Sequence, residues 1–167
     1  YSENGRYEMK KIYIGIDNGV TGSICILGDG AARHFPTPIK KELSYTKKKQ
    51  YINRIDFREF SHYLTAYAGM TNVICVIERP MINPGRWKAS MSAMRALEAT
   101  LNVFEISGLP YRYIDSKEWQ KSMLPSGLKK EELKKAAIDI AKRLFPTLKT
   151  KDADSILIAE YARRVKF

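Results

Sequence analysis

Short apolar runs separated by turn residues dominate the first part of the chain. Ile12–Asp17 and residues 21–27 are β-rich and flank an Asn-Gly pair, which predicts a hairpin because both residues tolerate positive φ. The turn Gly28-Asp29-Gly30 leads into a third strand at residues 32–35. Two prolines then end regular structure, and we expect residues 40–54 to form a long basic loop.

The remainder of the chain alternates helical and strand patterns. A continuous apolar run at residues 73–77, ending at Glu78, predicts a strand buried on both faces, and Tyr111–Ile114 predicts another. The element order is β-β-β-α-β-α-β-α-α, which indicates an α/β fold. The four helices are expected at residues 56–68, 88–107, 131–144 and 154–164.

This order brings two carboxylates together. The first and fourth strands are joined through a helix, so a return to the same sheet makes them parallel. If they are neighbours, Asp17 and Glu78 meet at their carboxyl ends. Like charges so close repel unless a cation sits between them, which favours a divalent metal site. A phosphate-binding loop and a plain acidic hairpin are the alternatives for Asp17 alone.

A third acidic segment, "TKDADSILIAEYARR", begins the last predicted helix. Asp152 and Asp154 lie two positions apart, which a regular helix would point in different directions, but a helix start relaxes that constraint. On this segment alone both residues are read as capping groups that complement the helix dipole. Together with Asp17 and Glu78, they are predicted to be metal ligands.

Composition narrows the class of partner. The chain has 167 residues and a formal net charge of +11, which favours a polyanion, nucleic acid above all. The two cysteines lie in apolar runs and indicate reduced thiols in a cytoplasm, and no apolar stretch is long enough to span a membrane. Residues 1–9 are expected to form a disordered leader ahead of a single domain, residues 10–167.

Three motifs carry a family resemblance: a strand ending GIDNG, a central strand ending IERP, and a helix opening DADSILIAEY. In this order they resemble the RuvC-type Holliday-junction resolvases, particularly the small phage and bacterial members. The resemblance implies a ribonuclease H-like fold, a five-stranded mixed sheet flanked by helices. It also implies a homodimeric crossover-junction endodeoxyribonuclease, active in the cytoplasm of a bacterium or a phage-infected cell, that cleaves four-way DNA junctions by two-metal hydrolysis.

The resemblance also assigns roles to residues. Asp17, Glu78 and Asp154 match ligand positions, whereas the fourth ligand position holds Lys151, so Asp152 is assigned through a local shift of the loop. Hard oxygen ligands suit two Mg²⁺ ions per site, with Mn²⁺ able to substitute. The lysines expected near the scissile phosphate are Lys117 and Lys130.

We expect the DNA-binding side chains to be basic or apolar and to lie in three segments. The aromatic wedge that follows the second carboxylate in the bacterial enzymes is absent, and Met81, Ile82 or Trp87 would take its role. The predicted DNA contacts are Lys40, Lys41, Lys47, Lys48, Lys49, Arg79, Met81, Arg86, Trp87, Lys88 and Lys129. The helix at residues 88–107, rich in small residues and methionine, is the predicted dimer interface or else internal core.

Three alternatives remain open. "GIDNGVTGS" is similar to the first phosphate loop of actin-like ATPases, but the chain is too short for their two domains. A non-catalytic branched-DNA-binding protein on the same fold would be favoured by an incomplete acidic cluster, to which Lys151 points. A ribonuclease H-like nuclease acting on RNA–DNA hybrids or flaps would keep the chemistry and change the substrate.

Overall fold

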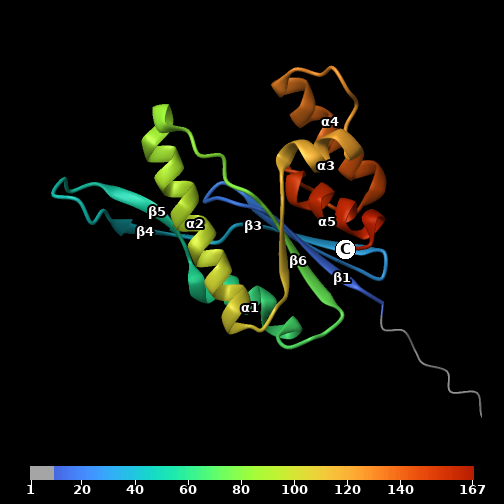
Figure 1. The fold of residues 1–167 in the computed structure, drawn as a ribbon, viewed down its shortest axis with the longest axis horizontal. Helices are drawn as coiled ribbons and strands as arrows, with labels where there is room; N and C mark the ends of the chain where they lie inside the picture. The colour runs from blue at the N-terminus through green and yellow to red at the C-terminus, as the bar shows by residue number, and fades with distance from the viewer. Residues whose placement is uncertain (1–9) are drawn as a thin grey trace, which may run out of the picture.

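The computed structural model describes residues 10–167, and the leader predicted for residues 1–9 lies outside them. A five-stranded mixed sheet in the order β3-β2-β1-β6-β7 forms the centre of the molecule (Figure 1). Strand β1 pairs antiparallel with β2 and parallel with β6, which confirms that the first and fourth predicted strands are neighbours. The strands are β1 (Ile12–Asp17), β2 (Ser23–Gly28), β3 (Ala31–Pro36), β6 (Val73–Glu78) and β7 (Tyr111–Ile114).

Helices cover both faces of this sheet. Helices α1 and α2 pack on one face, and α3, α4 and α5 cover the other (Figure 1). The predicted five-stranded sheet flanked by helices is therefore confirmed, although α3 is an addition that the sequence pattern did not predict. The helices are α1 (Phe57–Leu64) with the 3₁₀ turn Thr65–Tyr67, α2 (Trp87–Ile106) preceded by the 3₁₀ turn Pro84–Arg86, α3 (Ser116–Met123), α4 (Lys130–Leu144) and α5 (Asp154–Val165).

Side-chain alternation along β1 explains how the site is assembled. Ile14 and Ile16 are buried in the hydrophobic cluster under α1 and α2, whereas Tyr13 is buried in the cluster under α5. A Cβ at Gly15 would meet the Ser155 carbonyl oxygen at 2.2 Å, so glycine is what lets α5 lie directly on β1. Asp17 follows the alternation onto the same face as α5.

Both ends of residues 40–54 are strands joined by a turn at residues 44–50, so the prediction of one long basic loop is wrong. Strands β4 (Ile39–Leu43) and β5 (Tyr51–Ile55) form an antiparallel hairpin that lies beside α2 and extends away from the five-stranded sheet (Figure 1). Leu43 pairs with Tyr51 across the hairpin. Lys41 and Asn53, which pair with each other across the hairpin, stand where the alternation would place apolar residues, and this hides the period of two that would have identified the strands.

The cysteines and the hydropathy of the helices can also be compared between the sequence and the structure. Cys25 and Cys75 are both buried and free, as expected for reduced core thiols. Within residues 10–167, no helix has the length and apolar character needed to cross a bilayer.

Candidate metal centre

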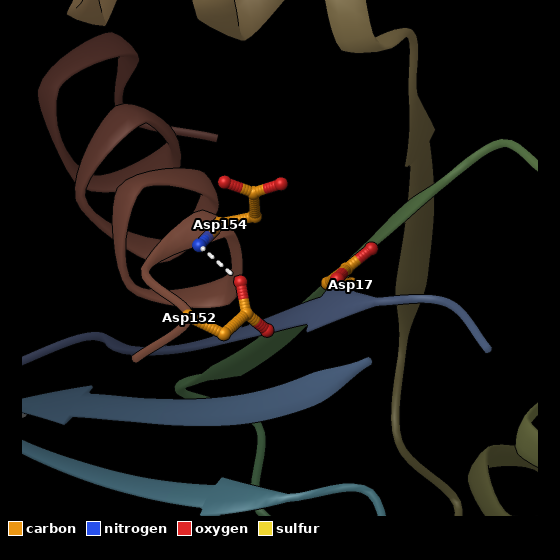
Figure 2. A group of neighbouring side chains, drawn as sticks. All are labelled: Asp17, Asp152 and Asp154. Carbon is orange, nitrogen blue, oxygen red and sulfur yellow. Dashed lines mark hydrogen bonds between the residues drawn. The ribbon is translucent and has the colours of Figure 1, made fainter. Parts of the chain in front are cut away.

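Three aspartates converge where β1 ends against the start of α5. One carboxylate oxygen each from Asp17, Asp152 and Asp154 lies within 4.8 Å of the other two (Figure 2). Asp17 is the last residue of β1, Asp154 is the first residue of α5, and Asp152 lies in the loop just before that helix. The sheet and the helix thus bring together groups that are far apart in the sequence.

Asp152 is held by specific contacts on both carboxylate oxygens. Its Oδ1 accepts a hydrogen bond from the backbone N–H of Asp154 at 3.3 Å, and its Oδ2 lies 2.8 Å from the Ser23 hydroxyl on β2 (Figure 2). The Ser23 hydroxyl also lies 2.7 Å from Ser155 Oγ. The N-cap position is Ala153, so Asp152 lies one residue before it and supports the helix start through the Asp154 N–H.

Glu78 lies beside the three aspartates without joining their group. The parallel register pairs Ile16 with Ile77, so Asp17 and Glu78 follow at neighbouring strand ends as predicted. The Glu78 carboxylate accepts a hydrogen bond at 2.5 Å from the indole N–H of Trp119 on α3. It is near enough that its negative charge contributes to raising the pKa of Asp17.

Burial and mutual repulsion raise the pKa values of three carboxyl groups in and beside the acidic cluster. Burial, followed by repulsion from Asp152, Asp154 and Glu78, raises the pKa of Asp17 to about 8. Burial and then the charge of Asp152 raise the pKa of Asp154 to about 6. Burial raises the pKa of Glu78 to about 6, against the opposing effect of the Trp119 hydrogen bond.

A cleft of about 1010 Å³ opens next to the aspartates, between them and helices α3 and α4. Lys134 lines this cleft, and its positive charge lowers the pKa of both Asp17 and Asp154. Sequence reasoning missed Lys134, since nothing distinguishes it within a helix that carries many lysines. It also missed Trp119, whose helix was not predicted. The other basic side chains that line the cleft are Lys130, Lys135 and Lys142.

The predicted catalytic lysines occupy different surroundings. Lys130 is the first residue of α4 and lines the cleft with the aspartates. Lys117 is exposed on α3 and does not line it. Lys129 is exposed just before α4, where its backbone N–H donates to the Glu132 carboxylate at 2.7 Å.

The predicted DNA-binding residues near Glu78 form an exposed group. Arg79, Met81 and Arg86 line a second hollow, of about 250 Å³, together with Glu78. Met81 is 80% exposed and Trp87 is 67% exposed, which is unusual for such large apolar side chains. Arg79 also pairs with Asp115 at 3.1 Å and lies over the Tyr113 ring, while Lys88 is exposed at the start of α2.

The predicted DNA-binding lysines at residues 40–49 lie on the β4–β5 hairpin. Lys47, Lys48 and Lys49 are exposed in its connecting turn, and Lys41 is exposed on β4. Lys40 differs from them because its ammonium pairs with the Glu42 carboxylate at 2.7 Å. The free positive charge of this segment is therefore concentrated at the far end of the hairpin.

The donor set of the acidic cluster fits a hard divalent cation. Every ligand atom in the group is a carboxylate oxygen, and such oxygens are the preferred ligands of Mg²⁺ and Mn²⁺. The raised pKa of Asp17 shows that its negative charge is poorly compensated by the protein alone. A bound cation would supply the missing positive charge.

Comparison with known proteins places the chain by its fold. No family model matches it, and no curated protein matches it in sequence. The structure is similar to that of Thermus thermophilus RuvC in complex with Holliday junction substrate, with a TM-score of 0.56 and 15% identity over 93% of this chain and 94% of that chain. It is also similar to a second T. thermophilus RuvC structure, with a TM-score of 0.51 and 16% identity over 93% and 96% of the two chains. The predicted RuvC-type, ribonuclease H-like fold is thereby confirmed.

Proposed function

We propose that this protein is a metal-dependent, structure-selective endodeoxyribonuclease that cleaves four-way or other branched DNA. The observation that carries the proposal is the convergence of Asp17, Asp152 and Asp154, with Glu78 alongside, on a fold shared with RuvC. Hydrolysis of a phosphodiester requires concentrated positive charge at the reacting phosphate, and a half-buried acidic cluster that borders a cleft is a means of holding divalent cations there.

Four carboxylates would serve as the metal ligands. Asp17, Asp152 and Asp154 would bind through the oxygens that already approach one another, and Glu78 would add a ligand from the adjacent strand. Two Mg²⁺ ions, for which Mn²⁺ can substitute, would activate the attacking water and stabilise the leaving oxygen when bound. Ser23 orients Asp152 through its hydroxyl, and the sheet holds Asp17 in place.

The lysines that line the cleft complete the catalytic group. Lys130 and Lys134 would bind the phosphate oxygens of the strand to be cut, because they face the cleft from which the aspartates are reached. Lys117, also a candidate for this role from its place in the sequence, lies outside the cleft lining. Basic side chains here offset the repulsion between the substrate and the carboxylates.

The proposed DNA surface extends from this cleft in two directions. One part is the exposed group that follows β6, formed by Arg79, Met81, Arg86, Trp87 and Lys88. Lys129, exposed just before α4, is proposed to add a further DNA contact. The other part is the β4–β5 hairpin, whose lysines would bind phosphates. The T. thermophilus RuvC structure in complex with Holliday junction substrate supports branched DNA as the ligand. The cytoplasm of a bacterium or phage-infected cell is the proposed place of this activity, as the sequence resemblance implies.

A homodimer is part of the proposal, because a four-way junction has two opposed strands to cut and a two-fold enzyme presents two equivalent sites. Within α2, Ala96 is buried against the subunit's own sheet and Ser90 bonds to Asn83, so these two small residues serve internal packing. Met94 is 45% exposed and is a better candidate for a partner contact. Light scattering would report about twice 19.2 kDa for a dimer.

The substrate is tested by comparing DNA forms under identical conditions. Four-way junctions, three-way junctions, flaps, RNA–DNA hybrids and linear duplexes of matched sequence would be incubated with the protein and Mg²⁺. The proposal predicts that the four-way junction or another branched DNA is cut fastest. Preferential cleavage of RNA–DNA hybrids would support the hybrid nuclease instead, and binding of junctions without any cleavage would support a non-catalytic junction-binding protein.

A further inference from the structure

We infer that Trp119 is a positioning residue for Glu78, holding one oxygen of that carboxylate so that the other remains available to a metal ion. The inference rests on the proposed function, in which Glu78 is a ligand. The indole Nε1 of Trp119 donates to Glu78 Oε2 at 2.5 Å, and because the acceptor is a carboxylate the hydrogen bond is charge-assisted when Glu78 is ionised. Oε1 is not engaged by this bond.

Trp119 is itself firmly held. Its side chain is fully buried in the hydrophobic cluster beneath α5, and this packing fixes the indole ring and α3. The Tyr161 hydroxyl makes a separate contact between α5 and α3, donating to Glu118 Oε1 at 3.1 Å, away from the indole N–H. A buried indole N–H needs a hydrogen-bond partner, and here the partner is a carboxylate of the proposed site. The position of α3 therefore fixes the position of Glu78.

Packing alone does not explain a tryptophan at this position. A phenylalanine would also fill an apolar cluster, but it would leave Glu78 without this donor. Within the part of the chain that the structure describes, Trp119 is the side chain that donates a hydrogen bond to Glu78. Because Glu78 lies outside the group formed by the three aspartates, its orientation determines whether it can share a cation with them.

Removal of this hydrogen bond should weaken metal binding rather than the fold. Groups that orient a metal ligand typically contribute ~10–100-fold to metal affinity. Trp119→Phe keeps an aromatic ring in the cluster and removes the N–H, so we expect Mn²⁺ affinity, measured by calorimetry without DNA, to fall by roughly 10–100-fold. Tyr161→Phe is the matched control, because it also removes one donor to a carboxylate where α3 meets α5 but leaves Glu78 untouched.

The hydrogen bond has its own spectroscopic signature. The protein contains two tryptophans, so a ¹H–¹⁵N spectrum shows two indole signals, and exposed Trp87 serves as an internal reference. We expect the Trp119 indole proton to resonate downfield of the Trp87 proton and to exchange slowly with solvent. In Glu78→Gln, the Trp119 signal should move upfield because a neutral acceptor binds the proton more weakly, and the Trp87 signal should stay in place.

Two results would overturn the inference. One is a Trp119 indole signal that does not respond to Glu78→Gln, and the other is Mn²⁺ affinity of folded Trp119→Phe equal to that of Tyr161→Phe. If Trp119→Phe does not fold, the spectrum of Glu78→Gln still decides. Both measurements are made without DNA, so an absence of DNA cleavage would count against the proposed function and not against this hydrogen bond.

Discussion

The Ser23 hydroxyl on β2 lies 2.8 Å from Asp152 Oδ2, and it joins the sheet to the loop that opens α5. This hydrogen bond orients Asp152 toward Asp17, while Asp152 Oδ1 accepts the N–H of Asp154 at the helix start. Because asparagine keeps an Oδ1 acceptor for that N–H and lacks the charge, the assignment of Asp152 as a metal ligand can be tested separately from the stability of the helix.

We predict that Asp152→Asn reduces cleavage at low Mg²⁺ by about 100-fold or more, with a smaller loss, of about 10-fold, for Ser23→Ala. Asparagine supports a helix start nearly as well as aspartate, so the change should leave thermal stability close to that of the wild type. Cleavage rates measured across a range of Mg²⁺ concentrations check this. Near-normal activity of Asp152→Asn at low Mg²⁺ would mean that Asp152 has a structural role at the start of α5 and is not a metal ligand.

The second prediction concerns the pH dependence of stability without metal. The pKa of Asp17 is about 8 in the folded protein against 3.8 for the free side chain, so between these pH values the folded state retains a proton that the unfolded state releases. The free energy of unfolding should therefore fall as pH rises from about 4 to 8, and one pKa unit corresponds to ~1.4 kcal/mol.

Asp17→Asn removes the largest part of this effect. The variant should be more stable than the wild type at neutral pH in the presence of a chelator, and its stability should depend less on pH, because Asp154 and Glu78 still have raised pKa values. Urea unfolding at pH 5, 7 and 9 measures both proteins. Identical pH profiles would show that Asp17 carries its charge without penalty.

The third prediction separates the candidate lysines. Lys134→Gln and Lys130→Gln should each slow cleavage on the order of 100-fold, as loss of a charge that faces the reacting phosphate does in other enzymes. Lys117→Gln should have a weaker effect, because Lys117 lies outside the cleft lining. Single-turnover rates at saturating protein isolate the chemical step. A larger loss for Lys117→Gln than for the other two variants would mean that Lys117 is the lysine that binds the reacting phosphate.

The fourth prediction concerns the hairpin. Replacing Lys47, Lys48 and Lys49 by Gln should flatten the plot of log affinity against log salt by ~0.9 for each phosphate that is no longer neutralised by a lysine. The control is the double variant Lys10→Gln, Lys11→Gln. These lysines precede β1, at the end of the strand away from Asp17, where Lys10 pairs with Asp29 and Lys11 donates to the Phe167 carbonyl. If the slope for junction binding is the same in all variants, the hairpin points away from DNA.

Much of the fold could be predicted because the pattern of apolar residues identifies most of its strands and helices. The runs of β1 and β6, joined through a helix, indicated parallel strands, and their adjacency in the sheet brings Asp17 and Glu78 to neighbouring strand ends. The hairpin β4–β5 was not predicted because Lys41 and Asn53 interrupt the alternation of apolar positions in its two strands. Helix α3 escaped because an eight-residue helix with two buried side chains shows almost no periodicity.

The site was predictable to the same extent. The carboxylates could be identified because strand order and a helix start restrict where they lie. The hydrogen bond between Trp119 and Glu78 depends on how α3 docks across the sheet, and no local pattern encodes that docking. The same is true of Lys134, which resembles the other lysines of α4 in the sequence and is distinguished by its position near the aspartates, where its charge lowers the pKa of Asp17 and Asp154.

The acidic cluster at Asp17 is what we propose makes this protein a metal-dependent nuclease for branched DNA. The most direct measurement compares wild type and Asp17→Asn on a labelled four-way junction, with binding and cleavage scored in the same samples with and without Mg²⁺. We predict that the wild type cuts the junction only with Mg²⁺, and that Asp17→Asn binds it with similar affinity and does not cut it. Full Mg²⁺-dependent cleavage by Asp17→Asn would contradict the claim.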